Sequence, residues 1–238
     1  MTCHRFLRAL ACVAPAATGL LLAAGCSETA TAPHFAIKPG PGSIGVVILV
    51  DTSGSMKDAV PDKDGKRRPK FELAAEALAE ILRQTGDWSR DHADKPLNLG
   101  IYSFSDKSRF VLPLGEFHAD AAQRAVKAIP RPDGGTAIGS ALQDAWSALK
   151  SANCERQYIL CITDGENTQG RHPREVMPVI HKESEGKVEI HFIAFDVDGK
   201  LFDFAKPYNG HVESAANKEQ LDAELTRIFQ KRILLEQQ

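Results

Sequence analysis

The sequence has 238 residues and a mass of 25.9 kDa, which is enough for one domain with a core of its own. Hydrophobic residues make up 43% and charged residues 25%, as in ordinary globular proteins. The formal net charge of -2 excludes a bulk electrostatic attraction to nucleic acid, so we expect no nucleic-acid partner. The one basic run, residues 63–70, is interpreted as a solvated loop.

Residues 1–26 predict an export signal, because two arginines precede an apolar run that is too short to span a membrane. The run ends in LLAAGCS, which resembles a bacterial lipobox, although Ala23 stands where leucine is usual. The resemblance implies that Cys26 carries lipid, such as palmitate, and anchors the mature chain to a membrane of the bacterial cell envelope. Ser27 resembles a signal for the outer membrane, at its periplasmic face or the cell surface. Ordinary cleavage and an uncleaved anchor are the alternatives.

Residues 27–43 are rich in Pro, Gly, Ser and Thr and predict a flexible tether, which leaves 44–235 as the folded domain. The predicted strands are 44–50, 97–104, 108–112, 157–163 and 188–195, with a further candidate at 210–214. The predicted helices are 70–84, 119–129, 138–150, 173–184 and 217–235. Several strands are apolar throughout, as expected when helices cover both faces of a sheet.

This alternation predicts an α/β fold with a doubly wound, mostly parallel central sheet flanked by helices. We expect the strand order 3-2-1-4-5-6, in which strands one and four are neighbours. The short gap at 105–107 predicts a hairpin and therefore one antiparallel edge strand. A G-x-G-x-x-G pattern over 40–45 precedes a strand instead of following one, so it does not predict a dinucleotide site. Cys154 and Cys161 are separated by extended chain and predict unpaired thiols.

Acidic and hydroxyl side chains follow two predicted neighbouring strands. Asp51, Ser53 and Ser55 come after the first strand, and Asp164 follows the fourth. Thr136 offers another hydroxyl in a glycine-rich loop between them. Ligands of open α/β sheets bind beyond the carboxyl ends of strands where the strand order reverses, so these oxygens predict one crevice. An all-oxygen set favours a hard cation, Mg²⁺ or Mn²⁺, with Ca²⁺ less favoured.

The motifs DTSGSM, GGT and TDGE, in this order, resemble the von Willebrand factor type A (VWA) domain with its metal-ion-dependent adhesion site (MIDAS). The resemblance covers about residues 44–235 and implies a Rossmann-like fold. It also implies that Ser53, Ser55 and often Thr136 contact the metal directly, while Asp51 and Asp164 act through water.

The resemblance further implies a non-enzymatic protein-binding module, used in adhesion or assembly. Its metal would coordinate a Glu or Asp carboxylate of a partner protein. The SMKD stretch is similar to a version in which two adjacent acids bind a second cation. Asp58 is the candidate ligand here, but Ala59 follows it.

Other interpretations stay open at this point. Asp51, Asp164 and Thr136 could be helix caps, and the serines could be turn residues. Asp196, in the stretch IAFDVDGKLFD, could be the nucleophile of a haloacid-dehalogenase-like phosphatase. The helix at 217–235 could shift when the site is occupied and make the chain a signalling or assembly component. His191 is interpreted as a structural strand residue, because the sequence assembles no site around it.

Overall fold

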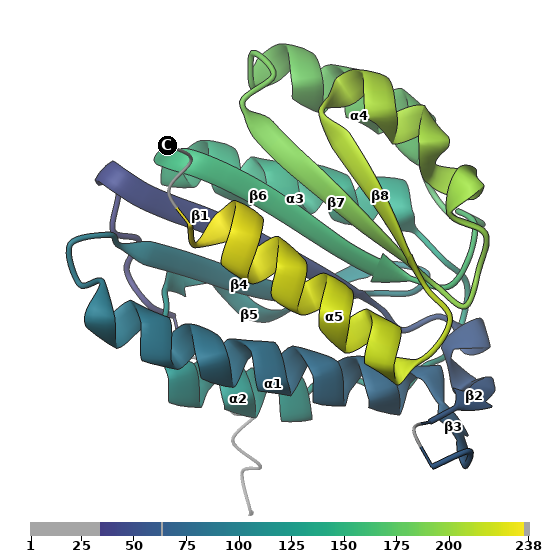
Figure 1. Cartoon of the computed structure of the whole chain (residues 1–238). Helices are drawn as coiled ribbons and strands as arrows, with labels where there is room; N and C mark the ends of the chain where they lie inside the picture. Colours follow the sequence, from purple (N-terminus) through teal and green to yellow (C-terminus); the bar gives the residue numbers. More distant parts are fainter. Residues whose placement is uncertain (1–33, 63, 236–238) are drawn as a thin grey trace, which may run out of the picture. The chain divides into compact units, whose positions relative to one another are not determined.

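The computed structural model describes residues 34–62 and 64–235 (Figure 1). The expected export signal, Cys26 and the first part of the expected tether lie outside the described residues. None of the helices in the described ranges is long and apolar enough to cross a membrane.

A six-stranded sheet forms the centre of the described domain. Its strands are β1 (Gly40–Asp51), β4 (Leu97–Phe104), β5 (Ser108–Glu116), β6 (Cys154–Thr163), β7 (Val188–Phe195) and β8 (Gly210–Ala215). The spatial order is β5-β4-β1-β6-β7-β8, and only β5 runs antiparallel to its neighbour within this sheet. This order and the antiparallel edge confirm the doubly wound fold expected from the sequence.

Helices cover both faces of the sheet, as Figure 1 shows. On one face lie α1 (Lys70–Asp91), α2 (Ala119–Lys127) and α5 (Lys218–Ile228). On the other lie α3 (Ile138–Ala152), α4 (Pro173–Glu183) and the 3₁₀ segment η2 (Gly199–Tyr208). Successive residues of a strand point to opposite faces, so Ile48 packs toward α1 and α5 while Leu49 packs toward α3. This two-sided burial explains why β1 is apolar over most of its length.

The amino-terminal boundary of the domain differs from the expected one. The tether was expected to end at residue 43, but β1 begins at Gly40, where it pairs with Cys154. The preceding residues also contact the sheet: the Glu116 N–H donates to the Ala36 carbonyl (3.0 Å), and the Lys38 N–H donates to Asn98 Oδ1 (2.8 Å). Glycine and proline composition indicated a loose segment, but backbone hydrogen bonds to the sheet hold these residues.

Three further segments differ from the sequence prediction. Within the expected loop after the first strand lie the 3₁₀ turn η1 (Gly54–Lys57) and a small hairpin of β2 (Ala59–Pro61) and β3 (Arg67–Pro69). The helix α1 continues to Asp91, beyond the predicted end at 84. The predicted helix at 217–235 is α5 followed by the π-helical turn η3 (Phe229–Ile233).

The end of the domain is firmly packed, and the cysteines are unpaired. Leu221, Leu225 and Ile228 of α5 are buried in the core. Cys154 and Cys161 are both free and buried, as the sequence predicted. Burial raises the pKa of both thiols, which makes them poor nucleophiles at neutral pH.

Candidate functional site

The predicted site residues lie at the carboxyl ends of the parallel strands, where β1 and β6 are neighbours. Asp51 is the last residue of β1, and Asp164 follows the last residue of β6. The pairing of β1 with β4 on one side and β6 on the other makes this the position where the strand order reverses.

The loop after β1 brings two hydroxyls to the carboxylate that follows β6. Ser53 Oγ and Ser55 Oγ are 3.1 Å apart, and the Ser55 hydroxyl donates to Asp164 Oδ1 at 2.7 Å. Ser53 and Asp164 are buried, whereas Ser55 is exposed. The three side chains therefore form a row of oxygen atoms. The row is buried at Ser53 and Asp164 and reaches the solvent at Ser55.

Asp51 connects the two strand ends that carry this row, because each of its carboxylate oxygens accepts a hydrogen bond from one of them. Oδ1 accepts the Ser53 N–H (2.7 Å), which fixes the turn after the strand, and Oδ2 accepts the Thr163 hydroxyl (2.6 Å). Asp51 is fully buried, and burial raises its pKa from 3.8 to about 6, against the opposing effect of the hydrogen bonds from Ser53 and Thr163. The carboxylate is thus positioned as a support behind the hydroxyls.

The glycine-rich loop of Thr136 is tied to the loop after β1. The Gly54 N–H donates to the Gly134 carbonyl at 3.0 Å, and Gly134 has a φ of +77° that a side chain would strain. Thr136 itself is buried. Its backbone N–H donates to Thr168 Oγ1 (2.9 Å), and its carbonyl accepts the Thr168 N–H (2.8 Å). Thr136 therefore lies in a loop at this edge and is fixed by the loop after β6.

A buried lysine that the sequence analysis missed belongs to the same cluster. Lys70, the first residue of α1, places Nζ 3.0 Å from Asp164 Oδ2 and 3.1 Å from Asp196 Oδ2. Burial lowers the pKa of Lys70, but Asp164 and Asp196 outweigh that effect and leave it raised. The sequence offered only an indirect signal for this cluster: Asp196, the second partner of Lys70, follows β7, whose carboxyl end lies at the same edge of the sheet.

The alternative that the acids and the threonine are helix caps is wrong. Within residues 34–62 and 64–235, the residues at the amino ends of the α-helices are Pro69, His118, Ala137, His172 and Asn217. Ser53 does precede η1, but its side chain makes no capping hydrogen bond there. Helix capping therefore does not explain why the motif residues converge.

Asp58, the candidate ligand of a second cation, is exposed. Its backbone is engaged instead: its N–H donates to the Ser55 carbonyl (2.9 Å), and its carbonyl accepts the Lys70 N–H (2.9 Å). Asp58 thus connects η1 to the start of α1 and helps to place Lys70.

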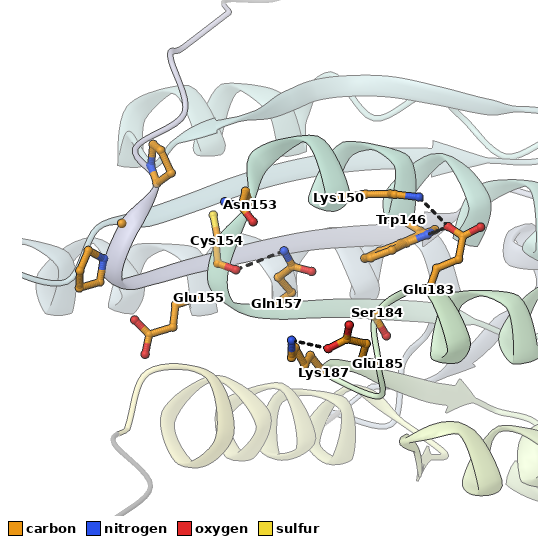
Figure 2. A pocket seen from close by; sticks show the side chains of 13 residues that line it. Trp146, Lys150, Asn153, Cys154, Glu155, Gln157, Glu183, Ser184, Glu185 and Lys187 are labelled. Atoms are coloured by element: carbon orange, nitrogen blue, oxygen red, sulfur yellow. Dashed lines mark hydrogen bonds and ion pairs between the residues drawn. The ribbon is translucent and has the colours of Figure 1, made fainter.

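Another cavity lies near the amino ends of the strands (Figure 2). It has a volume of about 820 Å³ and is lined by Pro39, Trp146, Lys150, Cys154 and Glu183 among others. The Trp146 indole N–H and the Lys150 ammonium both bind Glu183, at 2.8 and 3.0 Å. These bonds connect α3 to the end of α4, and the motif residues do not line this cavity.

Comparison with known proteins decides the family. The sequence model of the von Willebrand factor type A domain matches residues 45–228. The chain belongs to the VWA domain family. VWA domains are commonly protein-interaction or adhesion modules, are typically non-enzymatic, and often bind a divalent cation at the MIDAS. Among curated proteins, none matches the chain.

Solved structures agree on the fold. The PilB minor pilin from Streptococcus sanguinis has 14% identity and a TM-score of 0.65, over 85% of this chain and 63% of the pilin. Proximal thread matrix protein 1 from the mussel byssus has 17% identity and a TM-score of 0.61, over 79% of this chain and 45% of that one. A von Willebrand factor type A protein from Catenulispora acidiphila has 21% identity and a TM-score of 0.59, over 78% and 41%. The chain thus spans less than two thirds of each, and identities this low show the fold alone.

Proposed function

We propose that this VWA domain is a non-enzymatic adhesion or assembly module that binds a protein partner through a divalent cation, Mg²⁺ or Mn²⁺. The residues that would hold the cation are Asp51, Ser53, Ser55, Thr136 and Asp164. The observation that carries the proposal is the convergence of Ser53 Oγ, Ser55 Oγ and Asp164 Oδ1 from two strand ends that are over a hundred residues apart in sequence.

The spacing of these oxygens suits a small hard cation. Neighbouring ligands of an octahedral ion with bonds of about 2.0–2.1 Å are separated by about 2.9 Å. The separations of 3.1 Å between the serine hydroxyls and 2.7 Å between Ser55 and Asp164 bracket that value. The donors are oxygen atoms throughout, which favours Mg²⁺ or Mn²⁺ over softer metals.

The charges of the cluster also suit one divalent cation. Asp51, Asp164 and Asp196 carry three formal negative charges when ionised, and Lys70 carries one positive charge. The resulting formal charge of about -2 is what a single divalent ion neutralises. Lys70 binds Asp164 Oδ2, so that Oδ1 is the oxygen left facing Ser55.

The solvent side of the row is where a partner would bind. A bound divalent cation supplies positive charge that attracts an acidic side chain of a partner. Ser55 is exposed, and a cavity of about 380 Å³ borders the same loops and is lined by Thr52, Lys107, Arg109, Arg131 and Gly134 among others. Three basic side chains and the carboxylates of Asp106 and Asp133 line this cavity, and the formal excess of one positive charge supports a Glu or Asp carboxylate as the ligand.

Calorimetric titration of metal-stripped protein with Mg²⁺ and with Mn²⁺ tests the metal part of the proposal. We expect one cation per chain in the wild type and loss of binding in Asp51→Ala, Ser53→Ala and Asp164→Ala. Asp87→Asn removes an exposed carboxylate of α1 and is the matched control. A folded wild type that binds no cation, or variants that bind as well as the wild type, would refute the site.

A second measurement tests the carboxylate part. With Mn²⁺ bound, acetate that replaces a metal-bound water lowers the paramagnetic relaxation of the solvent protons. We expect a saturable decrease in the wild type with acetate and a smaller one with acetamide, which carries no charge. An equal response to both would remove the argument for a partner carboxylate.

We also propose that the chain is anchored by lipid at Cys26 and works at the bacterial cell envelope. The support is the LLAAGCS ending of the apolar segment. Expression in a bacterial host with an alkyne analogue of palmitate should label the wild type and leave Cys26→Ser unlabelled. Cys3→Ser, which changes a cysteine within the export signal, is the control and should not affect labelling of the mature chain.

A further inference from the structure

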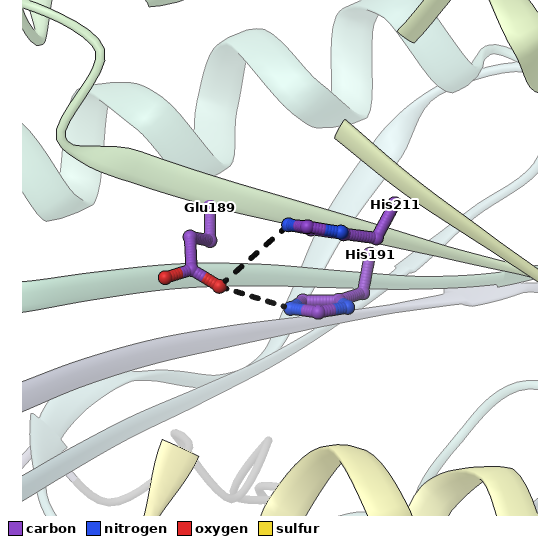
Figure 3. A group of neighbouring side chains, drawn as sticks. All are labelled: Glu189, His191 and His211. Carbon is purple, nitrogen blue, oxygen red and sulfur yellow. Dashed lines mark ion pairs between the residues drawn. The ribbon is translucent and has the colours of Figure 1, made fainter. Parts of the chain in front are cut away.

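Four polar side chains form a compact group on the last two strands of the sheet. Glu189 and His191 alternate along β7, and His211 and Glu213 alternate along β8. His191 and His211 are register partners in the parallel pair, so both acids and both imidazoles lie on one face. Figure 3 shows the two rings lying one over the other, with the Glu189 carboxylate beside both.

The centre of this group is a buried imidazole whose two nitrogens make only long ion-pair contacts. The His191 side chain is 1% exposed, yet neither of its ring nitrogens has a hydrogen bond within the described part of the chain. The nearest carboxylate oxygens are Glu189 Oε2, 3.6 Å from Nε2, and Glu213 Oε1, 3.7 Å from Nδ1. Buried polar atoms are almost always paired in folded proteins, so these atoms indicate an additional bonding partner.

The separations between the candidate ligand atoms fit a tetrahedral ion. The atoms offered by Glu189, His191 and His211 all lie within 4.8 Å of one another. Glu189 Oε2 is 3.6 Å from His191 Nε2 and 3.8 Å from His211 Nε2. Ligands around a tetrahedral zinc ion, with bonds of about 2.0–2.1 Å, are separated by about 3.4 Å. The two separations from Glu189 would need to contract by a few tenths of an ångström. The imidazoles, stacked with centroids 4.7 Å apart, would also have to tilt so that a nitrogen of each ring points at one ion.

The surroundings resemble the supporting shell of a metal site. Glu213 Oε1 faces Nδ1 of His191, the nitrogen opposite the candidate ligand atom, and Arg227 holds the same oxygen at 2.8 Å. A carboxylate in that place fixes the orientation and tautomer of a ligating imidazole. The His211 side chain is 34% exposed, so the group has an entry path and room for a water ligand on the solvent side.

We propose that Glu189, His191 and His211 form a second metal site that binds Zn²⁺ or a similar divalent transition ion. Two imidazoles and one carboxylate are a borderline ligand set that prefers zinc over the hard cations of the proposed MIDAS. Glu213 is a positioning residue. The bound ion would connect β7 to the edge strand β8 near their amino ends, on the face of the sheet that α5 and η3 cover. This inference does not rest on the proposed function.

Zinc titration of the whole chain, purified without a histidine tag and kept in millimolar Mg²⁺, tests the site. We expect the wild type to bind one Zn²⁺, with affinity at least about 100-fold higher than that of His211→Ala. Glu213→Gln should weaken binding by about 10- to 100-fold, as expected for a positioning carboxylate. His118→Ala changes a half-exposed histidine at the opposite edge of the sheet and should bind like the wild type.

Cobalt provides the second readout, because Co²⁺ with tetrahedral nitrogen and oxygen ligands has visible absorption bands that the octahedral ion lacks. We expect these bands in the wild type and in His118→Ala, and their loss in His211→Ala. His211 is half-exposed on an edge strand, so its truncation should leave the fold intact, which circular dichroism checks. Absence of saturable Zn²⁺ binding, or equal binding by the wild type and His211→Ala, would overturn the proposal.

Discussion

Replacing Asp51 with asparagine should stabilise the metal-free domain at neutral pH while it abolishes cation binding. The carboxyl is fully buried, and its pKa is raised from 3.8 to about 6. At about 1.4 kcal/mol per pKa unit, keeping this group ionised in the folded state costs about 3 kcal/mol. Asparagine has the same shape and no charge, and its amide can bond to both Ser53 and Thr163.

The sign of the pH dependence follows from the folded pKa lying above the unfolded one. Below about pH 3 the carboxyl is protonated in both states and contributes almost no difference. As the pH rises toward about 6, the unfolded state ionises first, so the metal-free wild type loses stability. Above about pH 6 the carboxyl is ionised in both states, and the full cost of burying its charge reduces the stability of the metal-free wild type. The advantage of Asp51→Asn should therefore be close to zero at about pH 3 and reach about 3 kcal/mol at pH 7.

Urea unfolding in the presence of a chelator measures this difference, and repeating it in Mg²⁺ should remove it. Saturating the wild type at about 100 times its dissociation constant adds about 2.7 kcal/mol, whereas the variant should gain nothing. Asp87→Asn, at an exposed position of α1, should stay within about 0.5 kcal/mol at every pH. If Asp51→Asn is destabilising at pH 7 in chelator, or if its effect is independent of pH, the reasoning is wrong.

Three other substitutions test separate contacts. Lys70→Met leaves the buried carboxylate of Asp164 without its cation, so the metal-free domain should lose about 3–5 kcal/mol and gain more from Mg²⁺ in thermal unfolding than the wild type does. Gly134→Ala would strain a φ of +77° and bring a methyl group 2.7 Å from Asp106 Oδ2; calorimetry should find weaker Mg²⁺ binding, and unchanged affinity would argue against a role for this loop. Leu225→Ala should cost about 2–5 kcal/mol in urea unfolding, because the side chain is fully buried, and a smaller loss would mean that α5 is loosely packed.

Sequence reasoning predicted the sheet well because hydrophobic patterns are local signals. The runs at 44–50, 157–163 and 188–195 are largely apolar, which is typical of strands covered on both faces, and all three are core strands. The boundary at Gly40 was missed because composition indicated a tether, while the hydrogen bonds that hold the segment come from distant strands.

The candidate site was only partly predictable from the sequence. The motif residues could be found from their order, but Lys70 had no motif to identify it, and its role depends on how α1 begins beside β6 and β7. His191 could not be joined to His211 in sequence, because only the register of two parallel strands makes them neighbours. Contacts that depend on register are set by the packing of the whole sheet, so they became visible only in the structure.

The strand β7 takes part in both proposed sites, which raises the question of whether they interact. Its amino half carries Glu189 and His191, while Asp196 directly after it binds Lys70. Five residues of extended chain separate His191 from Asp196 by about 16 Å, so the sites cannot share a ligand. Groups farther apart than about 7–10 Å usually act additively within about 0.5 kcal/mol. We therefore expect the Zn²⁺ affinity to change by less than about threefold between Mg²⁺-free and Mg²⁺-saturated protein. Asp51→Asn, which lacks the Mg²⁺ site, is the control. A larger change in the wild type that disappears in this variant would instead mean that β7 transmits the state of one site to the other.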